Sequence, residues 1–164
     1  MSSGNKAILL GESNIGKTSV IKQYISGEFN LESQETNAAE YFETKVVLAD
    51  KTITLDIWDT SGQEKYRSLT KFFIKDAKVI ILMYDITDEN SFEELKDFWY
   101  ISSKDSGATF FVVANKCDLS NKKVNDEEAK DFASKIGANF FSVSAKDNIG
   151  LSELFEKVGE AINK

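Results

Sequence analysis

An eight-residue stretch near the start of the chain, GESNIGKT at positions 11–18, constrains the fold more than any other feature. It fits the pattern Gly, any four residues, Gly-Lys-Ser/Thr, which is typical of a loop that binds phosphate groups. The apolar run Ala7–Leu10 precedes it and the helix-like segment Ser19–Ser26 follows it, so the loop is predicted to join a strand to a helix. Its glycines allow backbone N–H groups to turn toward a polyphosphate. The stretch predicts a nucleotide site.

Residues of this loop are expected to contact the phosphates directly. Lys17 is expected to reach the β- and γ-phosphates, and the Thr18 hydroxyl is expected to be a ligand of Mg²⁺. Backbone N–H groups of the loop and of the first helical turn would bind the remaining phosphate oxygens. The residues expected to bind the nucleotide in this region are Ser13, Asn14, Ile15, Gly16, Lys17, Thr18 and Ser19.

Strand-like and helix-like segments alternate along the chain, which predicts an α/β fold of the phosphate-loop NTPase type. We expect a doubly wound, six-stranded, mostly parallel sheet, with one antiparallel strand from the hairpin of 41–48 and 52–58. Ser91, with Glu94 three residues later, is expected to form a capping box that opens a helix at Phe92. The remaining strands are expected at 6–10, 79–84, 110–114 and 140–143, and about five helices at 18–25, within 59–71, at 92–103, from 125 or 126 to 137, and at 151–162.

Composition narrows the classes of protein to which this chain can belong. Its 164 residues suit a single domain spanning 1–164, and its net charge of −7 argues against a general nucleic-acid binder. It contains no histidine, which excludes histidine-based catalysis and histidine metal ligands. One cysteine, Cys117, excludes an internal disulfide and favours a reducing, cytoplasmic compartment, and no apolar run reaches membrane-spanning length.

A second polar stretch, DTSGQE at positions 59–64, follows a predicted hairpin strand that ends in Trp58. Asp59, at the end of this strand, is expected to hold Mg²⁺, as an aspartate in this place does in phosphate-loop enzymes. The N–H of Gly62 is expected to meet a γ-phosphate, and Gln63 is expected to orient a water molecule. On its own this stretch is a common turn sequence. Because it follows a phosphate loop, it becomes a specific indication of a nucleotide site.

Two further stretches follow predicted strands and select the base. NKCD at 115–118 offers a carboxylate, Asp118, that accepts both the N1–H and the N2 amine of guanine, whereas adenine has no such donor pair. SAK at 144–146 offers the N–H of Ala145 to the guanine O6. Both stretches lie at carboxyl ends of strands, where open α/β sheets bind ligands. The residues expected at the base are Asn115, Lys116, Asp118, Ser144, Ala145 and Lys146.

These four motifs together resemble those of a known family. GESNIGKT, DTSGQE, NKCD and SAK, in this order, are similar to guanine-nucleotide motifs of the Ras-superfamily small GTPases. IWDTSGQEKYRSL and LMYDITDENSFEELK are similar to the Rab family in particular, and the hairpin region is most similar to its early-endosomal branch. The resemblance covers essentially the whole chain. It implies a switch that binds GTP or GDP with Mg²⁺, hydrolyses GTP slowly and regulates vesicular membrane traffic.

The resemblance also implies roles for two loops, switch I at about 29–40 and switch II at about 59–73. Thr36 of switch I would close on Mg²⁺ and the γ-phosphate, and Phe29 would pack against the edge of the guanine. Gly62 of switch II would sense the γ-phosphate. The implied catalytic residues are Gln63, Lys17 and Thr36, and the implied metal ligands are Thr18, Thr36 and Asp59.

Protein partners that read the nucleotide state are implied as well. Tyr41, Trp58 and Phe73 match an aromatic surface that effectors contact together with the two switches. An exchange factor is implied, and so is a GTPase-activating protein that supplies an arginine, since the only arginine, Arg67, resembles a surface contact position. No cysteine lies near Lys164, so we expect attachment to the cytosolic face of an intracellular membrane only through a prenylated tail absent from this chain.

Departures from the family pattern leave alternatives open. Thr36-Asn37-Ala38 stands where the family usually has Thr-Ile-Gly, and Ala38 is less free than glycine to adopt positive φ. One alternative is therefore a GTP-binding interaction module with little or no hydrolysis, which replacement of Gln63 would distinguish from a hydrolysing switch. A third possibility is an ATP-using kinase or ATPase with a phosphate loop, and NKCD argues against it.

Overall fold

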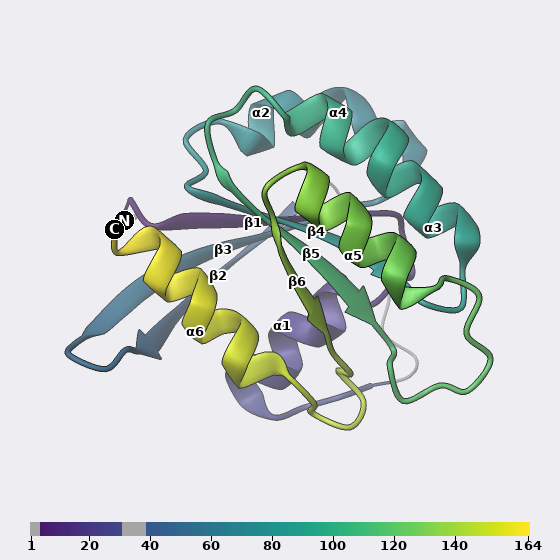
Figure 1. The fold of residues 1–164 in the computed structure, drawn as a ribbon. Helices are drawn as coiled ribbons and strands as arrows, with labels where there is room; N and C mark the ends of the chain where they lie inside the picture. The colour runs from purple at the N-terminus through teal and green to yellow at the C-terminus, as the bar shows by residue number, and fades with distance from the viewer. Residues whose placement is uncertain (1–3, 31–38) are drawn as a thin grey trace.

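The computed structural model describes residues 4–30 and 39–164 (Figure 1). Within these ranges six strands form one sheet in the order β2-β3-β1-β4-β5-β6. β2 pairs with β3 in antiparallel register and the other neighbouring strands are parallel, which confirms the predicted α/β sheet. The strands are β1 (Lys6–Leu10), β2 (Ala39–Val47), β3 (Thr52–Thr60), β4 (Val79–Asp85), β5 (Thr109–Asn115) and β6 (Asn139–Ser142).

Helices connect the strands and cover both faces of the sheet (Figure 1). A 3-10 turn and a short helix follow β3, which confirms the helical turns expected in that region. A single continuous helix runs through α3, a π-helical turn and α4. In residues 4–30 and 39–164 no helix has the length and apolar character needed to cross a bilayer. The helical segments are α1 (Lys17–Ser26), η1 (Glu64–Leu69), α2 (Thr70–Ile74), α3 (Glu89–Glu94), η2 (Leu95–Trp99), α4 (Tyr100–Ser103), α5 (Asp126–Lys135) and α6 (Leu151–Ile162).

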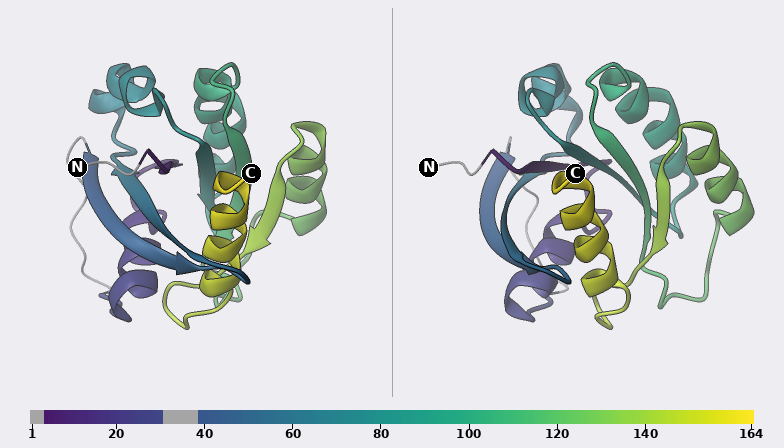
Figure 2. Two further views of the ribbon diagram at one scale, coloured as in Figure 1. Left: turned by 90° about the vertical axis from the view of Figure 1, so that its left-hand side faces the viewer. Right: turned by 60° about the vertical axis from the view of Figure 1, so that its left-hand side comes forward.

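Two apolar clusters, one on each face of the sheet, hold these elements together. α1 and α6 pack on one face, and α2, α3, α4 and α5 pack on the other (Figure 2). β1 contributes to both clusters because its side chains alternate: Ala7 and Leu9 belong to one, and Ile8 and Leu10 to the other. All four residues are fully buried, so the strand that leads into the phosphate loop is fixed from both sides.

α6 carries a stripe of buried apolar residues on its sheet-facing side. The ring of Phe155, in the middle of this stripe, is fully buried and stacks on Tyr24 of α1, with ring centres 4.2 Å apart. α6 therefore supports the helix that follows the phosphate loop. The buried apolar residues of the stripe are Leu151, Leu154, Phe155, Val158 and Ile162.

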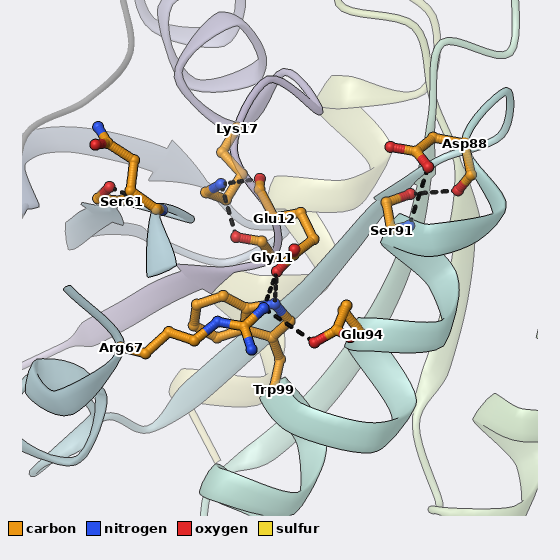
Figure 3. Close-up of polar contacts among 10 residues, drawn as sticks. Gly11, Glu12, Lys17, Ser61, Arg67, Asp88, Ser91, Glu94 and Trp99 are labelled. Carbon is orange, nitrogen blue, oxygen red and sulfur yellow. Dashed lines mark hydrogen bonds and ion pairs between the residues drawn. The ribbon is translucent and has the colours of Figure 1, made fainter. Parts of the chain in front are cut away.

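The predicted capping box at Ser91 is wrong. α3 begins at Glu89, and its N-cap is Asp88, whose carboxylate accepts a hydrogen bond from the Ser91 N–H at 3.3 Å. The Ser91 hydroxyl is fully buried and donates to the Asp88 carbonyl at 2.7 Å (Figure 3). Because an aspartate three residues earlier already caps the first turn, Ser91 lies inside the helix instead of before it.

Replacing Phe155 by alanine is expected to lower the free energy of unfolding by about 3–5 kcal/mol, because it leaves a cavity between α1 and α6. Urea unfolding followed by circular dichroism measures the change. The control is Lys157→Ala on the same helix, where 58% of the side chain is exposed. The control is expected to stay within about 0.5 kcal/mol of the native chain. A similarly small loss for Phe155→Ala would contradict the role given to this ring.

Candidate functional site

The phosphate loop turns sharply between β1 and α1. Asn14 and Gly16 adopt left-handed backbone conformations, with φ of 64° and 97°, which glycine adopts freely and asparagine more readily than most residues. Gly16 is the N-cap of α1, and in the described part of the chain no side chain caps that position. A helix N-terminus at the end of such a loop is a setting that suits an anion.

Lys17 lies buried beneath this loop. Its ammonium group donates hydrogen bonds to the carbonyl of Gly11 at 2.9 Å and to the carbonyl of Glu12 at 2.6 Å (Figure 3). Burial lowers the pKa of Lys17 to about 8, while the negative charges of Asp59 and Glu12 act in the opposite direction. The loop therefore surrounds a poorly solvated cation, and a polyphosphate would stabilise its charged form.

Thr18 and Asp59, two of the three expected Mg²⁺ ligands, lie in contact. The Thr18 hydroxyl donates a hydrogen bond to the Asp59 carboxylate, which is fully buried. β3 continues to Thr60, so Asp59 lies within the strand rather than beyond its expected end at Trp58. The third expected ligand, Thr36, lies outside the described residues.

The donor chemistry of this pair fits Mg²⁺. Hydroxyl and carboxylate oxygens are ligands that Mg²⁺ prefers, and the ion usually completes its shell with waters and substrate phosphates. Among the described residues, no group of three or more His, Cys, Asp or Glu side chains could hold a metal ion. A magnesium ion at Thr18 and Asp59 would take further ligands from water and bound phosphates.

The polar stretch after β3 lies directly against the phosphate loop. A Cβ atom added to Gly62 would come within 2.1 Å of the backbone of Glu12 and Ser13, so only glycine fits at this position. The N–H of the next residue, Gln63, donates to the Ser61 hydroxyl at 3.1 Å. The Ser61 hydroxyl thus holds the backbone at Gln63. Gly62 is therefore brought to the phosphate loop, and Gln63 follows it in the chain.

The loop after β5 meets the phosphate loop from another side. The Asn115 amide donates to the Ile15 carbonyl at 2.8 Å. The Lys116 ammonium donates to the Asn14 carbonyl at 3.2 Å and pairs with the Asp85 carboxylate at 2.8 Å. Asp85 belongs to none of the four motifs, yet it anchors a residue expected at the base. These contacts join the phosphate loop to the loop after β5, which we call the base loop because it carries residues expected to bind the base.

Asp118 is oriented by a residue behind it. The Ser144 hydroxyl is fully buried, donates to the Asp118 carboxylate at 2.7 Å and accepts from the Asp147 N–H at 3.0 Å. Ser144 is expected from the sequence to contact the ligand, whereas the structure places its hydroxyl on Asp118. The Ile15 side chain likewise packs in the core, which leaves only its backbone for a ligand.

A cleft of about 300 Å³ lies between these loops, which is the size of a small-molecule site. Most of its lining consists of residues predicted to bind phosphate or base. Asn30 and Leu119 also line it, and the motif analysis missed them because they lie outside the motifs. The lining residues are Asn14, Gly16, Ser19, Phe29, Asn30, Asn115, Lys116, Asp118, Leu119, Ala145 and Lys146.

Gln23 is another residue that the motifs did not identify. It is buried in α1, and its side-chain amide donates to the Ala145 carbonyl at 2.7 Å, 122 positions away in the sequence. Most residues of α1 are polar, so nothing in the sequence distinguishes Gln23 from the others. The contact ties the helix after the phosphate loop to the residue expected to meet the guanine O6.

Tyr41 and Trp58, on the paired strands β2 and β3, lie side by side with ring centres 5.2 Å apart. Tyr41 is 40% exposed, and its hydroxyl donates to the buried Asp56 at 2.6 Å, which raises the pKa of Tyr41 to about 12. Trp58 and Phe73 are half-buried and pack against the same apolar cluster. The aromatic side chains expected to contact effectors are thus anchored by the fold.

Comparison with known proteins shows the family to which this chain belongs. The model of the Ras family matches residues 6–164. Ras-related protein Rab-2B of Dictyostelium discoideum is 39% identical over 162 residues, covering 97% of this chain and 80% of the relative. Rab-21 of Geodia cydonium is 36% identical (96% and 70% covered), and Rab-3A of Homo sapiens is 37% identical (96% and 73% covered). The chain therefore belongs to the Ras family of small GTPases, and these relatives carry Rab names.

Proposed function

We propose that this protein is a GTP-hydrolysing switch of vesicular membrane traffic, read by effectors at switch I (29–40) and switch II (59–73). The observation that carries the proposal is the single cleft lined by both Gly16 of the phosphate loop and Asp118 of the base loop. A guanine nucleotide has to reach both loops at once. The traffic role rests on the similarity of the chain to Rab proteins.

Selection of guanine rests on Asp118 and Ala145. The hydrogen bond from Ser144 fixes the Asp118 carboxylate at the cleft, where it would accept the N1–H and N2 amine of guanine. Adenine would leave this carboxylate unpaired, which is costly in a site shielded from water. Gln23 holds the Ala145 carbonyl, so the neighbouring N–H groups keep a fixed direction toward the guanine O6.

Hydrolysis of GTP needs positioning and charge stabilisation more than a strong base. The contact of Gly62 with the phosphate loop supports its neighbour Gln63 as the residue that orients the attacking water. Lys17 would bind the β- and γ-phosphates. Mg²⁺, held by Thr18, Thr36 and Asp59, would neutralise charge on the same phosphates.

The intrinsic rate of GTP hydrolysis is expected to be slow because Arg67, the only arginine of the chain, is held in ion pairs with two glutamates. The Arg67 guanidinium bonds to Glu12 at 2.8 Å and to Glu94 at 2.9 Å. A GTPase-activating protein would supply the missing arginine and accelerate hydrolysis by about 10³–10⁵-fold.

Other partners follow from the exposed surface and from the resemblance. Effectors would contact Tyr41, Trp58 and Phe73 beside the switches, and an exchange factor would release GDP. The protein would act at the cytosolic face of an intracellular membrane, held there by a prenylated tail.

Gln63→Leu is expected to slow single-turnover GTP hydrolysis by about tenfold or more, because leucine cannot orient the attacking water. Phosphate release from preloaded GTP in Mg²⁺ measures the rate, with ATP run in parallel and expected to be ignored. Glu64→Gln, at the next position, is the control. If the native chain binds GTP tightly but shows no turnover that Gln63→Leu reduces, the result would instead favour an interaction module with little hydrolysis.

Asp118→Asn is expected to weaken GTP binding by about 10²-fold or more and to favour xanthosine triphosphate, whose C2 carbonyl accepts from the new amide. Competition against a fluorescent nucleotide gives the three affinities for GTP, xanthosine triphosphate and ATP. The exposed Asp105→Asn serves as the charge-matched control. An unchanged preference for GTP would remove Asp118 from the base site.

Gln23→Leu is expected to speed GDP release about fivefold, which corresponds to the roughly 1 kcal/mol of one buried hydrogen bond. Displacement of a fluorescent GDP analogue by excess GDP gives the rate. Lys22→Ala, an exposed change at the preceding position, is the control. If both variants release GDP at the native rate, the contact of Gln23 with Ala145 does not support the base site.

A further inference from the structure

A cluster of side chains joins the phosphate loop, switch II and α3 (Figure 3). One carboxylate oxygen of Glu12 accepts hydrogen bonds from the Arg67 guanidinium at 2.8 Å and from the Trp99 indole N–H at 2.7 Å. The same guanidinium nitrogen of Arg67 also donates to Glu94 at 2.9 Å. We refer to Glu12, Arg67, Glu94 and Trp99 as the Glu12 cluster.

The surroundings of the cluster are partly desolvated, so these contacts are stronger than surface ion pairs. Arg67 has 23% and Glu12 has 18% of its side chain exposed, and Trp99 is 1% exposed. The centre of the guanidinium lies 4.2 Å from the Phe98 ring centre and 5.3 Å from the Trp99 ring centre. Arg67 is therefore fixed by two carboxylates and two aromatic rings.

A fixed Arg67 also fixes Gln63, because a short hydrogen-bonded turn joins them. The Gln63 carbonyl accepts from the Tyr66 N–H at 3.0 Å, and the Arg67 carbonyl accepts from the N–H of Thr70, where α2 begins. Ahead of this turn, Gly62 lies against the backbone of Glu12. Switch II thus touches the phosphate loop at two points, one on each side of Gln63.

Glu12 places a negative charge in a loop that binds anions, and Arg67 explains how that charge is tolerated. An unpaired carboxylate beside the phosphates would repel them. The ion pair with Arg67 neutralises it, while the indole N–H of Trp99 occupies the same oxygen. Loss of Arg67 and loss of the Glu12 charge should therefore have different effects on nucleotide affinity.

We propose that Glu12 is a positioning residue for GTP hydrolysis: it anchors Arg67 and so holds Gln63 at the phosphate loop. The inference rests on the proposed function, since it concerns the step assigned to Gln63. Glu12 itself does not touch the reacting atoms in this assignment. Its loss should lower the rate of hydrolysis and leave the affinity for GTP intact.

The test compares Glu12→Gln, Arg67→Gln and the double variant in single-turnover hydrolysis and in GTP binding. Glu12→Gln should lower the hydrolysis rate by about tenfold with unchanged affinity, because small displacements of a positioned group are costly in rate. Arg67→Gln should lower the rate similarly and also weaken GTP binding. The double variant should bind GTP with the native affinity, because it no longer carries an unpaired Glu12 charge. Its hydrolysis rate should be no lower than that of the single variants, since both changes break the same contact between Glu12 and Arg67.

A matched control is Glu93→Gln, an exposed charge removal on the same helix as Glu94. It should leave rate and affinity unchanged. Trp99 fluorescence, measured in a Trp58→Phe background that leaves one tryptophan, should shift in Glu12→Gln and not in Glu93→Gln. This shift shows that the folded variant has lost the contact that the test concerns.

The outcomes separate the inference from the proposed function. The inference alone would be overturned by the following combination. The native chain hydrolyses GTP, and the Glu12→Gln variant shows a shifted Trp99 signal but hydrolyses GTP at the native rate. Additive rate losses in the double variant, or no rescue of affinity, would overturn it too. A native chain that fails to hydrolyse GTP would overturn the proposed function, and the positioning role with it.

Discussion

The buried ammonium group of Lys17 is the charge around which the rest of the site is arranged. Burial takes it out of water, and the carbonyls of Gly11 and Glu12 replace only part of the lost hydration. A polyphosphate would supply the missing negative charge. A side chain at Gly16 would collide with the Asn115 amide and one at Gly62 with the backbone of the loop, so these segments meet closely only because both residues are glycine.

The order of the strands explains why four separate motifs meet at this charge. β3, β1, β4, β5 and β6 are parallel neighbours, so their carboxyl ends lie along one edge of the sheet. The motifs lie at or just after the ends of β1, β3, β5 and β6, which is where open α/β sheets bind ligands. β1 is packed on both faces, and this fixes the start of the phosphate loop.

The strands, the phosphate loop and the base loops could be predicted because each is encoded in a short run of neighbouring residues. Contacts between distant segments could not: neither Gln23 with Ala145 nor Glu12 with Arg67 leaves a periodic pattern, since packing decides which side chains meet. A local rule failed at α3, where Asp88 and Ser91 both suit an N-cap and the earlier residue takes that place.

The π-helical turn at Leu95–Trp99 bears on how this protein tolerates changes in length. A π turn closes its hydrogen bonds one residue later than an α turn, so it accommodates an extra residue within a helix. Deleting one residue there would restore α-helical geometry and leave the two flanking segments in nearly the same orientation. A deletion within the α-helical segments on either side would instead rotate the residues beyond it by about 100°. The helix therefore tolerates a change of length at this turn and not in the α-helical segments beside it.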